Sequence, residues 1–113
     1  MYTFAVGHMA EHEILCAMCP TANVYTKETE DYEHHPIITF MRSGMPVSIS
    51  SDDPPYMVDV CQEYANAIEK MGFSEKELIA CARNAFAHSV KGKGCKYLGL
   101  FDKWVEDFER AEQ

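Results

Sequence analysis

The sequence predicts an α/β fold made of two parallel strands with helices between, around and after them. Residues 14–20 form a nearly continuous apolar run closed by proline, which is typical of a strand buried on both faces. Residues 46–50 alternate between apolar and polar side chains and predict a second strand. Because two strands do not make a complete sheet, residues 1–113 are expected to form a single incomplete domain of a larger fold.

Three segments lead up to the second strand. Residues 2–13 have apolar side chains near helical spacing and predict the end of a helix. Residues 21–33 are polar and predict a loop. Pro36 is tolerated in a first helical turn and opens a short helix, and Gly44 stands where that helix should stop. This helix provides the crossover that two parallel strands need.

Three helices are predicted after the second strand. The first runs from Val58 to Met71, with a glycine directly after it. Ser74 and Glu77 have the spacing of a capping box, which begins the next helix, from Glu75 to about Ser89. Residues 91–94 predict a flexible link. The last helix has apolar residues at helical spacing, which are interpreted as packing: Tyr97, Leu98, Phe101, Trp104, Val105 and Phe108.

Composition and charge narrow the class of protein. With 47% hydrophobic and 25% charged residues, the chain is expected to be globular with a modest core. A net charge of −8 argues against nucleic acids and anionic membranes as partners, although solubility alone also explains it. No apolar run of about 18 residues and no basic leader occur, so we expect a soluble chain without a signal peptide. Five cysteines without a disulfide pattern weakly favour a reducing compartment, but the compartment stays open.

The cysteine and histidine motifs do not by themselves predict a metal site. Cys16 and Cys19 form a C-x-x-C, but no second pair follows at zinc-finger spacing, so structural thiols are expected. His8 and His12 lie four apart on a predicted helix and lack a third ligand. His35 precedes the proline of a helix start, where capping or loop packing is expected. The H-x-E and H-E-x-x-H motifs of zinc hydrolases are absent.

The pair Asp52-Asp53 at the end of the second strand is the strongest indication of function. Because successive strand residues point to opposite faces, one carboxylate can face a site while the other lies beside it. Ser48 and Ser50 share the face of Asp52, which is therefore small and polar, while the opposite face is mostly apolar. This pattern indicates a barrel strand whose polar end faces a pocket. A solvated turn is the alternative interpretation.

Three motifs in this order resemble the adenosine deaminase family: Cys19-Pro20-Thr21-Ala22-Asn23-Val24-Tyr25-Thr26, His35-Pro36 and Val47-Ser48-Ile49-Ser50-Ser51-Asp52-Asp53-Pro54. Glu63-Tyr64-Ala65 and Ala82-Arg83-Asn84-Ala85 continue the similarity, which runs from about Met9 to the C-terminus. The resemblance implies the C-terminal part of a metal-dependent hydrolase (β/α)8 (TIM) barrel, namely its seventh and eighth β/α units plus the C-terminal helices. The Ser-Ser-Asp-Asp-Pro motif and the Trp104-x-x-x-Phe108 motif near the C-terminus look most like those of the secreted adenosine deaminase-related growth factors.

The resemblance also implies a reaction, the hydrolysis of adenosine to inosine and ammonia. Asp52 corresponds to a zinc ligand of the family, and Asp53 to the residue that hydrogen-bonds the purine. Zinc would lower the pKa of a bound water, and the resulting hydroxide would add to C6 of the purine. The family's other ligands and its acid/base glutamate lie on strands that correspond to no part of this chain. Since catalytic zinc usually has three or more protein ligands, the chain alone is expected to be inactive.

Three hypotheses for the function remain open. The chain is part of a deaminase whose complete form is catalytic, with a purine nucleoside as substrate. Alternatively, it is a non-catalytic remnant that associates with itself or with a partner chain through open strand edges. The third hypothesis is an unrelated small binding module in which Asp52-Asp53 is only a turn. The sequence does not discriminate among adenosine, adenine and AMP.

Overall fold

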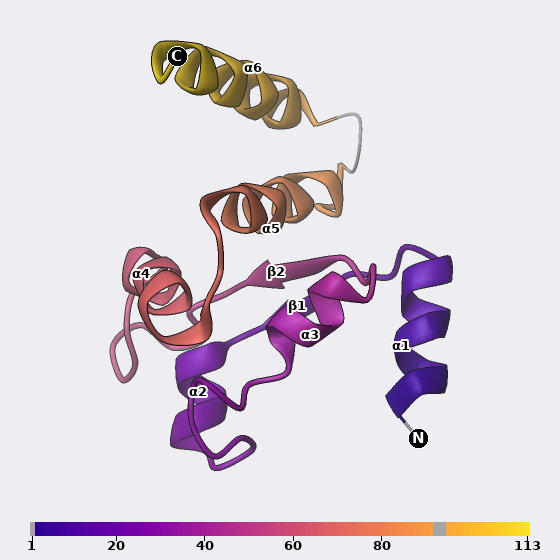
Figure 1. The fold of residues 1–113 in the computed structure, drawn as a ribbon, viewed down its shortest axis with the longest axis vertical. Coiled ribbons are helices and arrows are strands. Elements are labelled where there is room, and N and C mark those ends of the chain that lie inside the picture. The colour runs from indigo at the N-terminus through magenta and orange to yellow at the C-terminus, as the bar shows by residue number, and fades with distance from the viewer. Residues whose placement is uncertain (1, 92–94) are drawn as a thin grey trace.

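The computed structural model describes residues 2–91 and 95–113 and shows an α/β fold (Figure 1). Of the predicted link, residues 92–94 lie outside the described residues. In chain order the elements are α1 (Tyr2–Glu11), β1 (Cys16–Met18), α2 (Pro20–Tyr25), α3 (Ile37–Arg42), β2 (Val47–Ile49), α4 (Val60–Met71), α5 (Glu75–Ala87) and α6 (Lys96–Ala111). No helix in the described ranges has the length and hydropathy that a membrane crossing requires.

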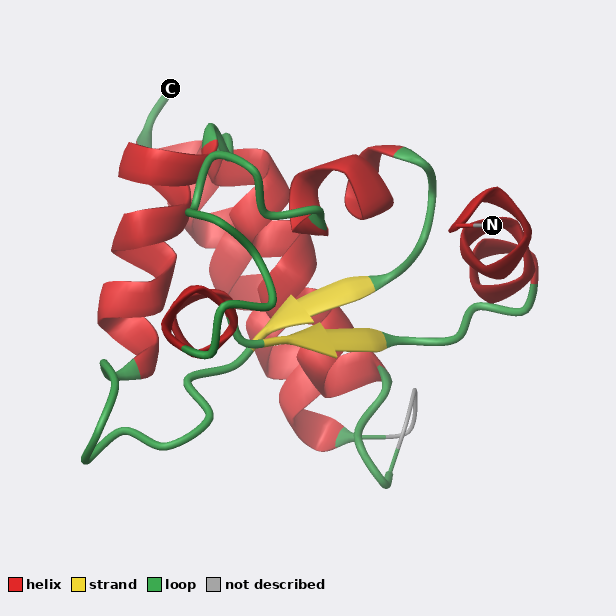
Figure 2. Cartoon of the chain, turned by 90° about the horizontal axis from the view of Figure 1, so that it is seen from below, coloured by secondary structure: helices red, strands yellow, loops and turns green. Residues whose placement is uncertain are grey.

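The two strands pair in parallel, as predicted, and form a two-stranded sheet (Figure 2). The register places Cys16 opposite Val47 and Met18 opposite Ile49. The Ser50 N–H donates to the Met18 carbonyl at 2.8 Å, which continues the ladder beyond the carboxyl end of β2. The two chain segments that leave the sheet there, after β1 and after β2, therefore start side by side.

One predicted loop contains a helix. Residues 21–33 were expected to be irregular, but α2 covers Pro20–Tyr25, and only the residues beyond it form the loop. Pro20 suits a first helical position because its ring sets φ and its missing N–H would have no helical partner there. The Thr21 N–H, another free donor of the first turn, is bound by the Glu63 carboxylate of α4 at 3.1 Å. This partner is 42 residues away, so local polarity could not indicate the helix.

The helix ends follow the predicted capping chemistry. The Ser74 hydroxyl accepts from the Glu77 N–H at 3.2 Å, and the Glu77 carboxylate accepts from the Ser74 N–H at 2.8 Å, which confirms the capping box. Gly44, with φ of 90°, follows α3, as predicted for a helix stop. Helix α4 begins two residues later than expected because the Asp59 side chain accepts from the Gln62 N–H at 2.8 Å and caps it.

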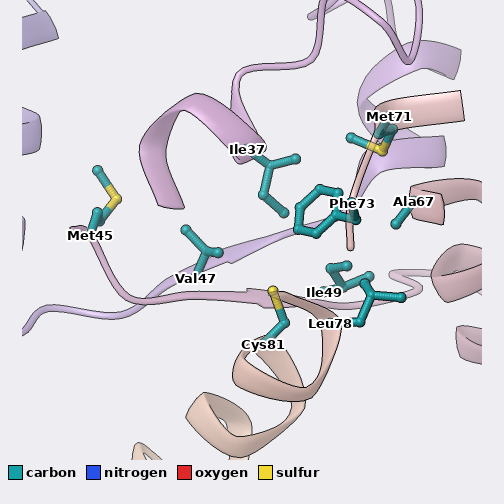
Figure 3. Close-up of a cluster of buried hydrophobic side chains, with 9 residues drawn as sticks. All are labelled: Ile37, Met45, Val47, Ile49, Ala67, Met71, Phe73, Leu78 and Cys81. Atoms are coloured by element: carbon teal, nitrogen blue, oxygen red, sulfur yellow. The ribbon is translucent and has the colours of Figure 1, made fainter. Parts of the chain in front are cut away.

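The hydrophobic core surrounds β2 rather than β1. All three residues of β2 are buried, whereas Ala17 of β1 is exposed. In the close-up, Ile37 of α3 and Cys81 of α5 approach β2 from opposite sides (Figure 3). The Asn84 side chain of α5 also donates to the Val47 carbonyl of β2 at 2.9 Å. Helices therefore cover β2, whereas Ala17 of β1 is exposed.

Helix α6 packs against α5. Phe86 and Phe101 bring their ring centroids to 5.3 Å, and Arg83 forms a two-point ion pair with Asp102. The predicted packing role of the apolar stripe is confirmed for buried Leu98 and for three half-buried residues, Phe101, Val105 and Phe108. Tyr97 and Trp104 are 54% and 58% exposed, although the Trp104 ring stacks on Phe108 with centroids 5.6 Å apart.

Candidate functional site

The candidate site lies where both strands end. In parallel α/β folds, the carboxyl ends of the strands share one edge of the sheet, and ligands bind there. β1 leads into Cys19 and α2, and β2 leads through Ser50 and Ser51 into the aspartate pair. The structure thus places Asp52 and Asp53 at the edge of the sheet that the sequence predicted for them.

Both aspartates are exposed, and Asp52 has an unusual backbone conformation. Its φ of 63° lies in the left-handed region, which non-glycine residues seldom adopt and aspartate tolerates better than most. Such conformations cluster at functional sites. The Asp53 carbonyl accepts from the N–H groups of Tyr56 and Met57 at 3.0 and 2.9 Å, so a turn begins at the pair. The pair therefore stands both at a strand end and in a turn.

Cys19 lies close enough to two carboxylates to respond to their charges. The pKa of its thiol is raised by burial first, and then by the negative charges of Asp52 and Glu63. A raised thiol pKa keeps the sulfur protonated near neutral pH, so Cys19 is a neutral neighbour of the carboxylates. The cysteine after β1, the aspartate after β2 and the glutamate of α4 consequently share one neighbourhood.

Glu63 was known from the sequence only as part of the motif Glu63-Tyr64-Ala65, and its burial was not predicted. It is 0% exposed, and its carboxylate accepts from both the N–H and the hydroxyl of Thr21. The Thr21 hydroxyl also lies 2.7 Å from the Tyr32 hydroxyl. Glu63 therefore ties α4 to the first turn of α2. One clue was present in the sequence, because Glu63 shares the buried face of α4 with Ala67 and Met71 at steps of four residues.

His35 stabilises the loop before α3. It is 3% exposed, and its Nδ1 accepts from the Ile37 N–H at 3.2 Å. Since this bond requires an unprotonated Nδ1, the imidazole proton resides on Nε2, which lies 3.0 Å from Asn23 Oδ1 and donates to it. Burial lowers the pKa of His35, which favours this neutral form. The capping and packing role predicted for His35 is confirmed.

The described residues do not by themselves form a metal centre. Across residues 2–91 and 95–113, no group of three histidine, cysteine or acidic side chains is placed to hold a metal ion. The rings of His8 and His12 are tilted against each other with centroids 4.2 Å apart, and Cys16 and Cys19 are free thiols. Asp52 is thus at most one ligand of a site whose remaining ligands would come from elsewhere.

Comparison with solved structures identifies the fold class. A crystal structure of an adenine deaminase from Arthrobacter aurescens matches the structure with a TM-score of 0.83 and 24% sequence identity. The match covers 92% of this chain and 33% of that one. The chain therefore has the fold of part of an α/β (β/α)8 barrel, which confirms the predicted fold class.

Sequence comparison then assigns the family. The model of the family described as adenosine deaminase matches residues 5–102, so the chain belongs to the adenosine deaminase family. Aminodeoxyfutalosine deaminase of Streptomyces coelicolor is 41% identical over 80 residues, 70% of this chain. Adenosine deaminase of Shewanella loihica is 36% identical over 78 residues, 68% of this chain. The chain spans 21% and 24% of the lengths of these two relatives.

Proposed function

We propose that this chain provides the seventh and eighth β/α units and the C-terminal helices of a hydrolase that deaminates an adenosine-like substrate. The observation that carries the proposal is the position of Asp52 and Asp53 just beyond the carboxyl end of β2, in a chain that belongs to the adenosine deaminase family. Active sites of (β/α)8 barrels lie at the carboxyl ends of the strands. The paired carboxylates are therefore at the end of the barrel where substrate would bind.

In this proposal Asp52 is a zinc ligand and Asp53 a hydrogen-bond partner of the purine. Carboxylate oxygens are accepted zinc ligands, and both side chains are exposed and free to reach a ligand. The left-handed backbone of Asp52 also supports a functional role. This conformation costs free energy, and an exposed side chain offers few contacts that would compensate for the cost, so stability alone does not explain it. The substrate's identity and the growth-factor branch stay predictions.

We further propose that the chain is inactive until the remaining ligands are supplied. The test compares the purified chain with a longer protein in which a His-x-His strand precedes it. Both are given excess zinc, and ammonia release from adenosine, adenine and AMP is measured together with bound zinc. We expect release only from the longer protein. Turnover by the chain alone with stoichiometric zinc would contradict its inactivity.

The individual roles are tested in the active longer protein. Asp52→Ala should remove zinc and lower kcat/KM by at least about a thousandfold, as expected when a metal ligand of a catalytic site is lost. Asp53→Asn should retain zinc and lower kcat/KM by about tenfold to a hundredfold. Cys61→Ser, which changes an exposed residue of α4, is the matched control and should change neither. Retention of zinc and activity in Asp52→Ala would exclude Asp52 as a ligand.

Association with a partner chain is the second candidate, and the exposure of β1 favours it. The described sheet has two strands, and Ala17 of β1 is exposed while β2 is covered. A strand supplied by another chain could therefore pair with β1. Sedimentation of the chain with a separately expressed N-terminal barrel segment should show a complex, which Ala17→Pro weakens because proline cannot donate in the ladder. A monodisperse monomer under all conditions would contradict this candidate.

A further inference from the structure

A cavity of about 310 Å³ lies between α5 and α6, and none of its lining residues belongs to the strand-end site. It is lined by Tyr64, Glu75, Leu78, Ile79, Ala82, Phe101, Trp104 and Phe108. This volume is at the small end of the range of ligand pockets, which run from about 300 to 1,000 Å³. A ligand that fits is therefore small.

Four of the lining residues are aromatic, and three of these follow one face of α6. The ring centroids of Phe101 and Trp104 are 6.2 Å apart, and those of Trp104 and Phe108 are 5.6 Å apart and nearly parallel. Tyr64 reaches the same cavity from α4, and burial raises its pKa to about 12, so its ring stays uncharged at neutral pH. The cavity is therefore lined by several uncharged aromatic rings.

The surroundings of this aromatic cavity are acidic. Glu75 lines the cavity itself, and it also lines a neighbouring hollow of about 270 Å³ with Glu109 and Glu112. Lys76 is the cationic residue among those lining this hollow, so acidic groups outnumber it. The whole chain has a net charge of −8. Anionic ligands are disfavoured here, whereas a cation is attracted both by the carboxylates and by the negative faces of the rings.

We propose that this aromatic cavity binds a small quaternary ammonium compound. Such a group is apolar at its surface and fully charged, so it can enter a cavity lined almost entirely by carbon without leaving unmatched hydrogen-bond donors. Ring faces attract a cation placed within about 6 Å of their centroids, and tryptophan does so best. The exposure of Trp104 leaves one of these rings accessible from solvent. This ligand is independent of the proposed deamination.

The test uses choline and its uncharged isostere 3,3-dimethylbutan-1-ol as probes. Trp104 is the single tryptophan, so its fluorescence reports on this cavity directly. We expect saturable quenching by choline and at least roughly tenfold weaker binding of the isostere, since only the charge differs. Calorimetry should show at least roughly tenfold weaker choline binding in Trp104→Ala and about threefold weaker binding in Glu75→Gln.

Leu100→Ala is the matched control, because Leu100 is 61% exposed on the same helix and does not line the cavity. It should bind choline like the unchanged chain. Circular dichroism of each variant verifies that α6 is retained. Equal affinity for choline and the isostere would show a merely apolar cavity and overturn the proposal. Absence of saturable choline binding, or an equal loss in Leu100→Ala, would overturn it as well.

Discussion

The acidic residues near the ends of the strands differ in burial and in hydrogen bonding. Asp52 and Asp53 are exposed, and Asp52 has a left-handed φ of 63°. Glu63 is completely buried, and its carboxylate accepts from the N–H and the hydroxyl of Thr21. The exposed pair is available to a ligand, whereas the buried glutamate is used up by protein donors. Neighbouring carboxylates can therefore differ completely in burial and in hydrogen bonding, so that only one of them stabilises the fold through protein donors.

The largest expected effect on stability concerns Glu63, the buried carboxylate. Glu63→Ala removes the acceptor for two donors of Thr21 and leaves a cavity, so it should lower the free energy of unfolding by about 3 kcal/mol. Urea unfolding measures the loss. Glu63→Gln keeps an acceptor oxygen and should cost only about 1 kcal/mol. If Glu63→Ala unfolds at the same urea concentration as the unchanged chain, the buried carboxylate is not a structural tie.

The next effect concerns His35 and depends on pH. Its folded pKa is lowered by burial, so the stability it provides is complete above the unfolded value of about 6.5 and is lost as pH falls below it. Protonation of Nδ1 would also break the bond from the Ile37 N–H. His35→Gln should cost about 1–2 kcal/mol at pH 7.5 and flatten the dependence between pH 6.5 and 5. Unfolding curves at several pH values test this, and an unchanged slope in the variant would contradict it.

Helix α5 offers a smaller effect at a third acidic group, which is partly exposed. Ser74→Ala removes half of the capping box and should lower the free energy of unfolding by about 1 kcal/mol.

Hydrogen bonds from Arg42 and from the Ser74 backbone lower the pKa of Glu77. The stabilisation by Glu77 is therefore complete above its ordinary carboxyl pKa of about 4.3 and is lost as pH falls through the lower folded value. Thermal unfolding at pH 6 and pH 3 should show a smaller difference in Glu77→Gln.

The smallest effect concerns Asp52, which is exposed, and it is a gain in stability and not a loss. Asp52→Gly relieves the left-handed backbone and should stabilise the chain by up to about 1 kcal/mol. Asp53→Gly is the matched control, because Asp53 is not among the residues with positive φ, and it should give no gain. Equal changes in the two variants, measured by urea unfolding, would show that the conformation of Asp52 stores no strain.

Much of the fold could be predicted from local patterns, although the strand lengths and the helix α2 could not. The capping box of Ser74 and Glu77 is a contact between neighbours in the chain, so its spacing alone predicted it. The parallel pairing followed from two apolar segments separated by a helix. Helix α2 was missed because one of its first-turn donors is satisfied by Glu63, a partner that lies far along the chain. The exposure of Trp104 could not be predicted either, since helical spacing shows an apolar stripe but not what covers it.

The α/β class, the family and the position of Asp52-Asp53 at the end of a strand could be predicted without coordinates. These features depend on periodicity, turn residues and ordered motifs, which are properties of neighbouring residues. The folded chain was needed to show which carboxylate is buried, which strand is covered and that Cys19 lies near both Asp52 and Glu63. Burial and hydrogen bonding depend on contacts between distant segments, and local sequence does not encode their partners.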